Sequence, residues 1–592
     1  MATDNKYDRQ LRLWGVHGQR ALATSKICVL NVGPTGSESL KNLVLPGCGD
    51  VTIVDPYLVE EADLANNFFV SPKSLGHPRA QVVADLLQEM NPDVQNCTAL
   101  QVQPSDLISN EPSFFSAFSI VIGTQLREGS ARGLAKICTA AGIPLVLAHS
   151  YGLLGYVRCC VPEHCIVEAK PEPTPLEDLR LANPWPELLE FSESIGLETM
   201  QEHEHGHVPY AVVLLQLAQV WRKAHGGELA KTAHEKEEFK QMIVEASLDY
   251  QRRAYSKKLA AYEKTDEYQA QVGAGISPEE AVATIGVEKP CWGREINYEE
   301  ARKFSFTAHV KRGVPYEAQQ VLADPKAAAT TPLTKLFWVI ARALKEFVED
   351  GDGSVPLNGS VPDMTASSDM YIAMQKVYGD KARQDYENVL GRVRAIFNSA
   401  DIDEASVVAF PYAETVEGAV KLFCKNAEFI QVLRHRDIED ECNLARDEDG
   451  DIPTLGSLQM DIMMKSMDDS YLPEQCCANW YLMYRAAQRF EAQNGFYPGT
   501  RNSQLAADAA RLFAIAKQTS SEIGFEETAP PITENHAVEM TRYGACEIHN
   551  IASFIGGITA QEAVKLITCQ YVPLNNTYIF NGITGDGQSY AM

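Results

Sequence analysis

A glycine-rich turn and the acidic residue that follows it form the part of this sequence whose spacing best matches a known chemistry. The turn is Gly33-Pro34-Thr35-Gly36, and Asp55 stands at the end of the next apolar run. In a strand–turn–helix–strand unit, the N–H groups of such a turn bind phosphate and the acid binds a ribose hydroxyl. Gly33, Gly36 and Asp55 are therefore candidate residues for binding ATP or a dinucleotide.

The same turn lacks part of what a phosphate group needs. Asn31 stands where the first glycine of G-x-G-x-x-G belongs, and Pro34 has no main-chain N–H to donate. Asp55 is equally compatible with a helix cap or a surface ion pair. The sequence therefore predicts a nucleotide-binding fold whose phosphate site is damaged.

The elements that must position these residues alternate between strands and helices. Apolar runs predict strands over residues 26–32, 51–54, 119–124 and 144–148. Periodic apolar residues between them predict helices over residues 37–45, 79–90 and 129–141. This alternation is typical of an α/β fold with a parallel sheet, helices on both faces and ligands at the carboxyl ends of the strands.

The alternation ends after residue 151, and helical patterns dominate from residue 187 to residue 520. The proline-rich segment 171–186 marks a crossover between domains. The clearest helices are predicted over 336–348 and 478–493, before a helix over 551–567 and a strand over 577–581 restore the α/β pattern. We therefore expect an α/β domain built from residues 1–170 and 531–592, interrupted by a mainly helical insertion over 171–530.

Composition excludes several classes of protein. The net charge of −27, without a basic stripe, argues against nucleic acid as a partner. We expect neither a signal peptide nor a membrane span, because the first residues are charged and no apolar run approaches ~20 residues. The 14 cysteines include no C-x-x-C pair, which favours free thiols in a reducing compartment and predicts no metal site.

Three other clusters of reactive side chains favour structural roles. His203, His205 and His207 precede a predicted helix over 210–222, and a turn-and-cap role is favoured because no fourth metal ligand is evident. The cysteine pairs at 159–160 and 476–477 lack two further ligands. Cys291 is favoured as a structural or incidental cysteine over a nucleophile.

Several segments, taken in order, resemble a known family. They are Y-D-R-Q-L-R-L-W-G at 7–15, K-N-L-V-L-P-G at 41–47, N-N-F-F at 66–69, S-Y-G-L-L-G-Y at 150–156, L-E-D-L-R-L at 176–181, F-W-V-I-A-R-A-L-K-E-F-V at 337–348 and N-N-T-Y-I-F at 575–580. Together they resemble the ThiF- and MoeB-like adenylating enzymes that activate ubiquitin and ubiquitin-like proteins. Among these, the chain resembles the regulatory subunits of heterodimeric activating enzymes of the neddylation pathway. Residues 247–294 look like extra sequence that this resemblance does not cover.

The resemblance implies an adenylation site that has lost its function. Active members bind phosphate with an Asn-x-x-Arg-Gln run and a lysine, and bind Mg²⁺ with an aspartate. The matching positions here are residues 63–67, which lack the arginine, then Arg79 and Gln125. A neutral amide is a poor Mg²⁺ ligand, and arginine keeps the charge of lysine but not its shape. The vestigial cofactor-binding residues implied by the resemblance are Gly33, Gly36, Asp55 and Arg79.

The resemblance also implies how the chain acts. No cofactor binds this chain; ATP and Mg²⁺ bind a catalytic partner subunit, whose ATP site Arg9 enters in trans. Contacts with that subunit are implied at Lys345 and Glu346, taken as exposed, and at Asp350. The heterodimer adenylates a ubiquitin-like modifier and forms a thioester on the partner subunit. A conjugating enzyme then binds transiently for later transfer to cullins, in the cytoplasm and the nucleus.

Three other functions remain open on sequence alone. One is a self-sufficient adenylating enzyme, which the missing magnesium ligand and the missing thiol context disfavour. Another is a nicotinamide-dependent oxidoreductase with a degenerate fingerprint, which Pro34 disfavours. The last is a scaffold in which Arg9 is a surface residue paired with Asp8 or another acid.

Overall fold

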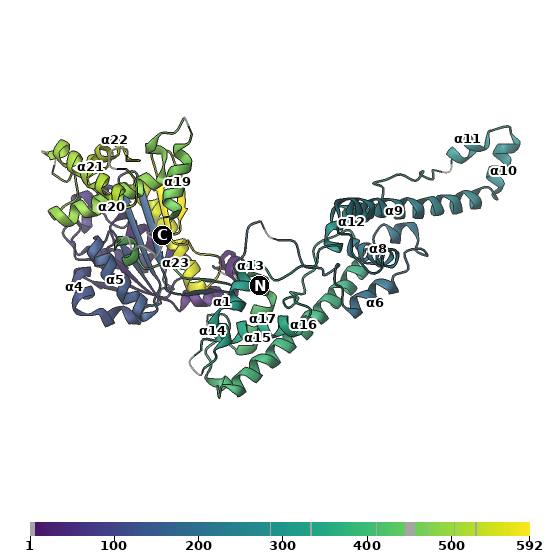
Figure 1. The fold of residues 1–592 in the computed structure, drawn as a ribbon, viewed down its shortest axis with the longest axis horizontal. Helices are drawn as coiled ribbons and strands as arrows, with labels where there is room; N and C mark the ends of the chain where they lie inside the picture. The colour runs from purple at the N-terminus through teal and green to yellow at the C-terminus, as the bar shows by residue number, and fades with distance from the viewer. Residues whose placement is uncertain are drawn as a thin grey trace. The chain divides into compact units, whose positions relative to one another are not determined.

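The chain forms two compact units (Figure 1). The computed structural model describes residues 6–592 apart from 174, 285, 332–333, 410, 444–455, 469, 502–503 and 527–529. Unit 1 contains Met1–Lys170, Val408–Ala419 and Phe429–Met592, and unit 2 contains Pro171–Val407 and Val420–Glu428. The predicted nucleotide-binding residues all belong to unit 1.

The centre of unit 1 is a sheet in which the described residues form eight strands, in the order β10-β9-β6-β5-β4-β1-β2-β3. The strands are β1 (Lys26–Leu30), β2 (Asp50–Val54), β3 (Cys97–Leu100), β4 (Ile120–Thr124), β5 (Leu145–Tyr151), β6 (Leu154–Cys160), β9 (Thr577–Asn581) and β10 (Asp586–Tyr590). A separate two-stranded sheet pairs β7 (His164–Ile166) with β8 (Gln431–Leu433).

This sheet is parallel on one side and antiparallel on the other. Strands β3, β2, β1, β4 and β5 run parallel, which confirms the predicted parallel sheet for this part of the chain. Strands β6, β9 and β10 are antiparallel to their neighbours and extend it. Strand β6 can return directly beside β5 because Gly152, with a φ of 58°, provides the left-handed turn between them.

Helices cover both faces of the sheet, as predicted. In unit 1 they are α1 (Asp8–Ala23), α2 (Pro34–Val44), α3 (Arg79–Met90), α4 (Pro104–Asn110), α5 (Glu128–Ala141), α18 (Ile438–Asn443), α19 (Gly456–Ser466), α20 (Cys477–Asn494), α21 (Leu505–Glu522), α22 (Glu534–Tyr543) and α23 (His549–Thr568). Alternate residues of β1 point to opposite faces. Ile27 and Val29 pack with α2, α3 and α23, whereas Cys28 and Leu30 pack in the core that contains α5 and α20.

The helices within residues 429–530 belong to unit 1, which corrects the insertion predicted over 171–530. Trp480, Met483 and Phe490 of α20 enter the same apolar core as α5, β4 and β5, and α21 and α22 pack against α20. A helical pattern shows that one side of a helix is apolar, but not which domain covers that side. Here the apolar face of the sheet takes these helices as its second layer.

Unit 2 is helical. Its helices are α6 (Pro186–Ser194), α7 (Glu202–His205), α8 (Tyr210–Ala224), α9 (Ala233–Tyr262), α10 (Asp266–Gly273), α11 (Pro278–Ala283), α12 (Ile296–Lys303), α13 (Tyr316–Ala323), α14 (Pro325–Ala328), α15 (Leu336–Asp350) and α16 (Ser368–Ser399), while α17 (Val416–Lys425) runs from unit 1 into unit 2. One core joins the buried face of α8 to Phe239 of α9, Tyr298 of α12 and Tyr378 of α16.

Residues 247–294 form the second half of α9 followed by α10 and α11, which lie at the end of α9 (Figure 1). Helix α10 has no buried residue, and Ala281 is buried in α11. These two helices therefore contribute little to the core of unit 2. Across the described residues, every helix is too short or too polar to cross a bilayer.

Candidate functional site

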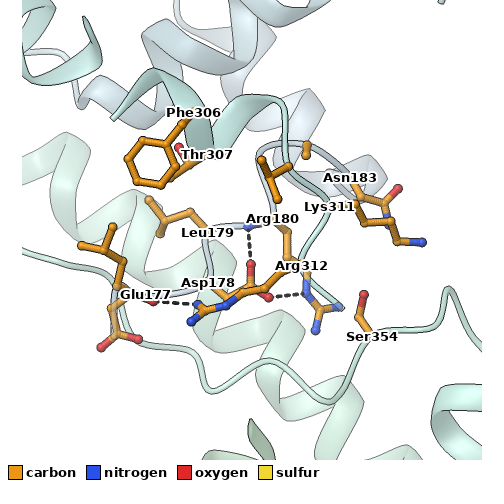
Figure 2. A pocket seen from close by; sticks show the side chains of 13 residues that line it. Glu177, Asp178, Leu179, Arg180, Asn183, Phe306, Thr307, Lys311, Arg312 and Ser354 are labelled. Carbon is orange, nitrogen blue, oxygen red and sulfur yellow. Dashed lines mark hydrogen bonds and ion pairs between the residues drawn. The ribbon is translucent and has the colours of Figure 1, made fainter. Parts of the chain in front are cut away.

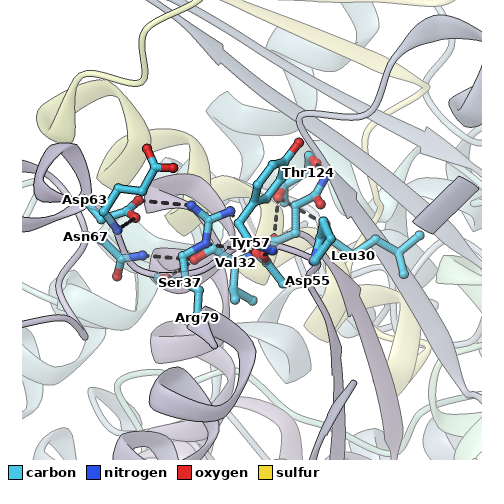
Figure 3. Close-up of polar contacts among 12 residues, drawn as sticks. Leu30, Val32, Ser37, Asp55, Tyr57, Asp63, Asn67, Arg79 and Thr124 are labelled. Atoms are coloured by element: carbon cyan, nitrogen blue, oxygen red, sulfur yellow. Dashed lines mark hydrogen bonds and ion pairs between the residues drawn. The ribbon is translucent and has the colours of Figure 1, made fainter. Parts of the chain in front are cut away.

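Asp55 lies just past the carboxyl end of β2, and its side chain is fully buried. Its Oδ2 accepts a hydrogen bond from the Val32 N–H at 2.7 Å, and its Oδ1 accepts one from the Tyr57 N–H at 2.9 Å (Figure 3). Burial of an ionised carboxylate is costly unless an opposite charge and hydrogen bonds satisfy it. The position of Asp55 is that of the predicted ribose acid, but its oxygens bind groups of this chain.

Arg79, the first residue of α3, supplies the opposite charge. Its Nε and Nη2 donate to Asp55 Oδ2 at 3.0 and 2.9 Å, and its Nη1 donates to Asp63 Oδ1 at 3.0 Å (Figure 3). Burial acts to lower the pKa of Arg79, but the two carboxylates outweigh it and raise that pKa above its ordinary value. The candidate ribose acid and the candidate phosphate-binding cation therefore bind each other.

The glycine turn leads directly into α2. This helix begins at Pro34, before the predicted start at residue 37, because a proline at the first helical position removes an N–H that has no partner within the helix. A Cβ on Gly36 would lie 2.2 Å from the main-chain oxygen of Asn31, so only glycine fits there. Asn31 has a φ of 66°, which asparagine tolerates better than most residues.

Glu547, which no sequence pattern indicated, lies against this turn. Its Oε2 accepts hydrogen bonds from the Thr35 N–H at 3.0 Å and from the Thr35 hydroxyl at 2.5 Å. Its Oε1 is 2.7 Å from the point where a Cβ on Gly33 would stand. The carboxylate thus fills the space beside the first turn of α2. No local signal could have identified this contact, because 512 residues separate its two partners.

Amides occupy the positions where a magnesium-binding aspartate and a phosphate-binding arginine are expected, and they bind the main chain. Gln125 Nε2 donates to the Ser150 carbonyl at 2.7 Å, and its Oε1 accepts from the Ser150 N–H at 3.2 Å. Asn66 Nδ2 donates to the Glu547 carbonyl at 2.8 Å. Asn67 Nδ2 donates to the carbonyl of Val32, beside the turn, at 2.9 Å. These side chains brace the turn and its surroundings.

Arg9 does not join this cluster. It lies in the first turn of α1 and is exposed to solvent. Asp8, the acid considered as its partner, pairs instead with Arg12 at 2.9 Å. Throughout the described part of the chain, no residue forms a hydrogen bond or an ion pair with Arg9.

The three predicted interface residues lie in the last turns of α15. Asp350 is exposed, but Lys345 and Glu346 are half-buried, so the expectation that both are exposed was wrong. Glu346 Oε1 accepts from Arg342 Nε at 3.0 Å, and Asp350 Oδ2 pairs with Arg392 Nη1 at 2.7 Å. The continuous apolar side of α15 draws these residues partly into unit 2.

His205 is a buried core residue, which corrects its predicted turn-and-cap role. Its Nδ1 lies 2.5 Å from Glu295 Oε1, and its ring stacks on Tyr250 with the centroids 3.5 Å apart. His207 follows the C-cap residue Gly206 of α7, and its Nδ1 lies 2.7 Å from the His203 carbonyl. Within the described residues, no three His, Cys, Asp or Glu side chains are grouped so that they could hold a metal ion.

The cysteines at 159–160 and 476–477 are free and buried. Burial raises the pKa of the Cys159, Cys160 and Cys476 thiols above the ordinary value and that of Cys477 to about 11. A thiol that stays protonated is a poor nucleophile and a poor metal ligand. Cys291 is exposed, and its N–H donates to Gln251 Oε1 at 3.0 Å.

Unit 2 contains a pocket of about 320 Å³ that none of the predicted site residues lines. Leu179 and Phe306 form part of its apolar wall (Figure 2). The arginines around it are already bonded: Arg312 Nη1 donates to the Leu176 carbonyl at 2.6 Å, and Arg180 Nε donates to Asp178 Oδ2 at 3.4 Å. The L-E-D-L-R-L segment therefore builds one wall of this pocket.

Comparisons with known proteins cover the whole chain. A family model described as the ThiF family matches residues 7–592. The chain is 40% identical to the NEDD8-activating enzyme E1 regulatory subunit AXL of Arabidopsis thaliana, over 99% of each chain. It is 37% identical to the NEDD8-activating enzyme E1 regulatory subunit of Xenopus laevis, over 98% of this chain and 97% of that one.

A solved structure, E. coli tRNA N6-threonylcarbamoyladenosine dehydratase TcdA in complex with AMP, matches 26% of this chain and 64% of its own, at 21% identity and a TM-score of 0.23. That residues 247–294 are extra sequence relative to the family stays a prediction.

Proposed function

Because this chain belongs to the ThiF family and, within it, to the NEDD8-activating enzyme E1 regulatory subunits, we propose that it is the half of a heterodimeric enzyme without a complete active site of its own. ATP and Mg²⁺ bind the catalytic partner subunit, and no cofactor binds this chain. The observation that carries the proposal is the buried ion pair of Arg79 with Asp55, at 2.9 Å. The Arg79 guanidinium, which would bind phosphate, and the Asp55 carboxylate, which would bind ribose, bind each other instead.

The rest of the turn supports the same proposal. A nucleotide needs free N–H groups at the start of the helix, and the Thr35 N–H is bonded to Glu547. It also needs a carboxylate for Mg²⁺, and the neutral Gln125 is bonded to Ser150. Family membership leaves a nicotinamide-dependent oxidoreductase without support.

Arg9 is the residue that we propose acts on the partner's ATP. An exposed guanidinium that no described residue binds suits this role, because its charge is permanent and its planar fork binds two phosphate oxygens at once. Positive charge placed where negative charge develops lowers the barrier to phosphoryl chemistry. A pure scaffold would not need this arginine.

The other partners follow from the same assignment. The heterodimer adenylates NEDD8, the ubiquitin-like modifier named in the relatives, and carries it as a thioester on the catalytic subunit. A conjugating enzyme binds transiently and takes the modifier toward cullins, in the cytoplasm and the nucleus. Reconstitution tests the assignment: NEDD8-dependent ATP–pyrophosphate exchange should require the partner and be absent with this chain alone. Exchange by this chain alone would make it a self-sufficient adenylating enzyme.

We predict that the isolated full-length chain shows no Mg²⁺-dependent ATP binding in the micromolar range by titration calorimetry. The reason is that Gln125 offers no carboxylate and Arg79 is held by Asp55 and Asp63. The Gln125→Asp variant should not restore binding, because the turn would still be filled. Micromolar binding by either protein would contradict the prediction.

We predict that Lys345→Glu weakens assembly with the catalytic subunit at least about tenfold, since reversing a charge at an interface opposes a like charge across it. The measurement is the dissociation constant of the heterodimer. Arg383→Glu is the matched control, because it reverses an exposed basic residue of α16 in the same unit, paired with Asp380 at 2.8 Å. Equal affinity for the two variants would remove Lys345 from the interface.

A further inference from the structure

The first turn of α2 binds an anion that belongs to this chain. The free N–H groups at the start of a helix attract negative charge, and such sites bind phosphate or carboxylate. Here the bound group is the Glu547 carboxylate, with its Oε2 3.0 Å from the Thr35 nitrogen and 2.5 Å from the Thr35 hydroxyl oxygen. The contact therefore has the chemistry of an oxyanion site with the anion in place.

The absence of a side chain at residue 33 makes room for this carboxylate. Any Cβ at Gly33 would meet Glu547 Oε1 at 2.7 Å, which is closer than the two atoms can approach. The turn has thus kept the glycine that a phosphate-binding turn uses for close approach. Here the group that lies close to this glycine is the Glu547 carboxylate.

The residues around the Glu547 carboxylate shift its pKa in opposite directions. Burial raises the pKa of Glu547 above its ordinary value. Hydrogen bonds from the N–H and the hydroxyl of Thr35 oppose that rise, and so does the positive charge of Arg79. An aspartate at 125 would add a second negative charge to this cluster, whereas the Gln125 amide is neutral.

The main chain around Glu547 is fixed by two further hydrogen bonds. Asn66 Nδ2 donates to the Glu547 carbonyl at 2.8 Å, and the Gly152 N–H donates to the carbonyl of the preceding Cys546 at 2.8 Å. Gly152 lies between β5 and β6, so the segment before α23 is tied to the carboxyl end of the sheet. The hydrogen bonds of Cys546 and Glu547 therefore hold the Glu547 side chain next to the turn.

We propose that Glu547 is a built-in ligand of the anion site at the start of α2, where its carboxylate stands in for a nucleotide phosphate group and closes the site. Without the Glu547 side chain, the site would bind a tetrahedral oxyanion such as phosphate. This deepens the proposal that the chain binds no nucleotide of its own. It is independent of the role of Arg9.

The test is thermal unfolding of the full-length chain in inorganic pyrophosphate without Mg²⁺. The midpoint of the wild-type chain should not respond. The midpoint of Glu547→Ala should rise by about 2 °C or more at concentrations well above the dissociation constant, because a ligand that binds only the folded state stabilises it. Calorimetry should detect one site in this variant.

The matched control is Glu539→Ala, which removes one negative charge from α22 in the same unit, where Glu539 pairs with exposed Arg542 at 3.4 Å. This variant should behave as the wild-type chain does. No response of Glu547→Ala, or an equal response of both variants, would overturn the proposal. A failed NEDD8 adenylation test would be a separate result, because that test uses the heterodimer.

Milder variants decide the question if Glu547→Ala does not fold. Glu547→Gln and Thr35→Val each weaken the contact while nearly keeping the shape of the side chain. If the carboxylate is the ligand of this turn, the double variant should lose clearly less in unfolding midpoint than the two single losses added together. Additive losses would overturn the proposal.

Discussion

Replacing Arg9 with alanine should lower NEDD8 adenylation by the assembled heterodimer by ~10²-fold or more, if this residue behaves as arginine fingers do in other phosphoryl-transfer enzymes. The side chain is exposed and has no partner within the described residues, so its loss should change the free energy of unfolding by only about 0.5 kcal/mol. The measurement is NEDD8-dependent ATP–pyrophosphate exchange with the wild-type catalytic subunit. Arg9→Lys should recover part of the rate, because it keeps the charge but loses the two-oxygen grip.

Arg12→Ala is the control for this experiment. It removes the same charge from the same helix, and among the described residues its loss breaks only the exposed pair with Asp8. Exchange by that heterodimer should match the wild type. Equal rates of ATP–pyrophosphate exchange by equal amounts of the Arg9→Ala and wild-type heterodimers would show that Arg9 takes no part in the reaction. The chain would then be a scaffold only.

Replacing Arg79 with alanine should lower the free energy of unfolding of unit 1 by about 3–5 kcal/mol, the usual cost of leaving one partner of a buried ion pair alone. The side chain of Asp55 is 0% exposed and that of Arg79 is 12% exposed, so solvent would do little to replace the lost charge. Asp63 would lose its partner at 3.0 Å as well. Denaturant unfolding of the full-length chain measures the effect.

Arg12→Ala gives the comparison, because the side chains of Arg12 and its partner Asp8, 2.9 Å apart, are 78% and 57% exposed. Its loss should cost only about 0–1 kcal/mol, as for other pairs near solvent. The Arg79→Ala, Asp55→Ala double variant should lose less stability than the two single losses added together, since neither buried charge remains. A loss of less than about 1 kcal/mol for Arg79→Ala would show that the pair does not hold the site together.

The sequence alone determined most of the first α/β half. Helix 79–90 and strand 577–581 are confirmed residue for residue as α3 and β9, and the other strands are confirmed to within a few residues at either end. Such elements are set by local patterns, in which apolar residues recur with the period of a helix or fill a buried strand. The position of Asp55 at the end of β2 follows from the same patterns.

The sequence did not show which distant element a helix or strand packs against. Residues 429–530 read mainly as helices, and among the described residues the helices α18 to α21 lie there. The sheet of unit 1, and not the insertion, covers their apolar sides. The missed strand β3 is only 4 residues long, and the missed strand β6 depends on the turn at Gly152. Burial against a distant element leaves no periodic signal in the segment itself.

The state of the candidate site was decided by tertiary structure. The types of Gln125 and Arg79 indicated a damaged nucleotide site, but only the fold shows that Arg79 binds Asp55 and that Glu547 fills the turn. These contacts join residues 24 and 512 positions apart in the chain. A side chain's chemistry can be read from its type, whereas its partner is chosen by which segments packing brings within hydrogen-bond distance.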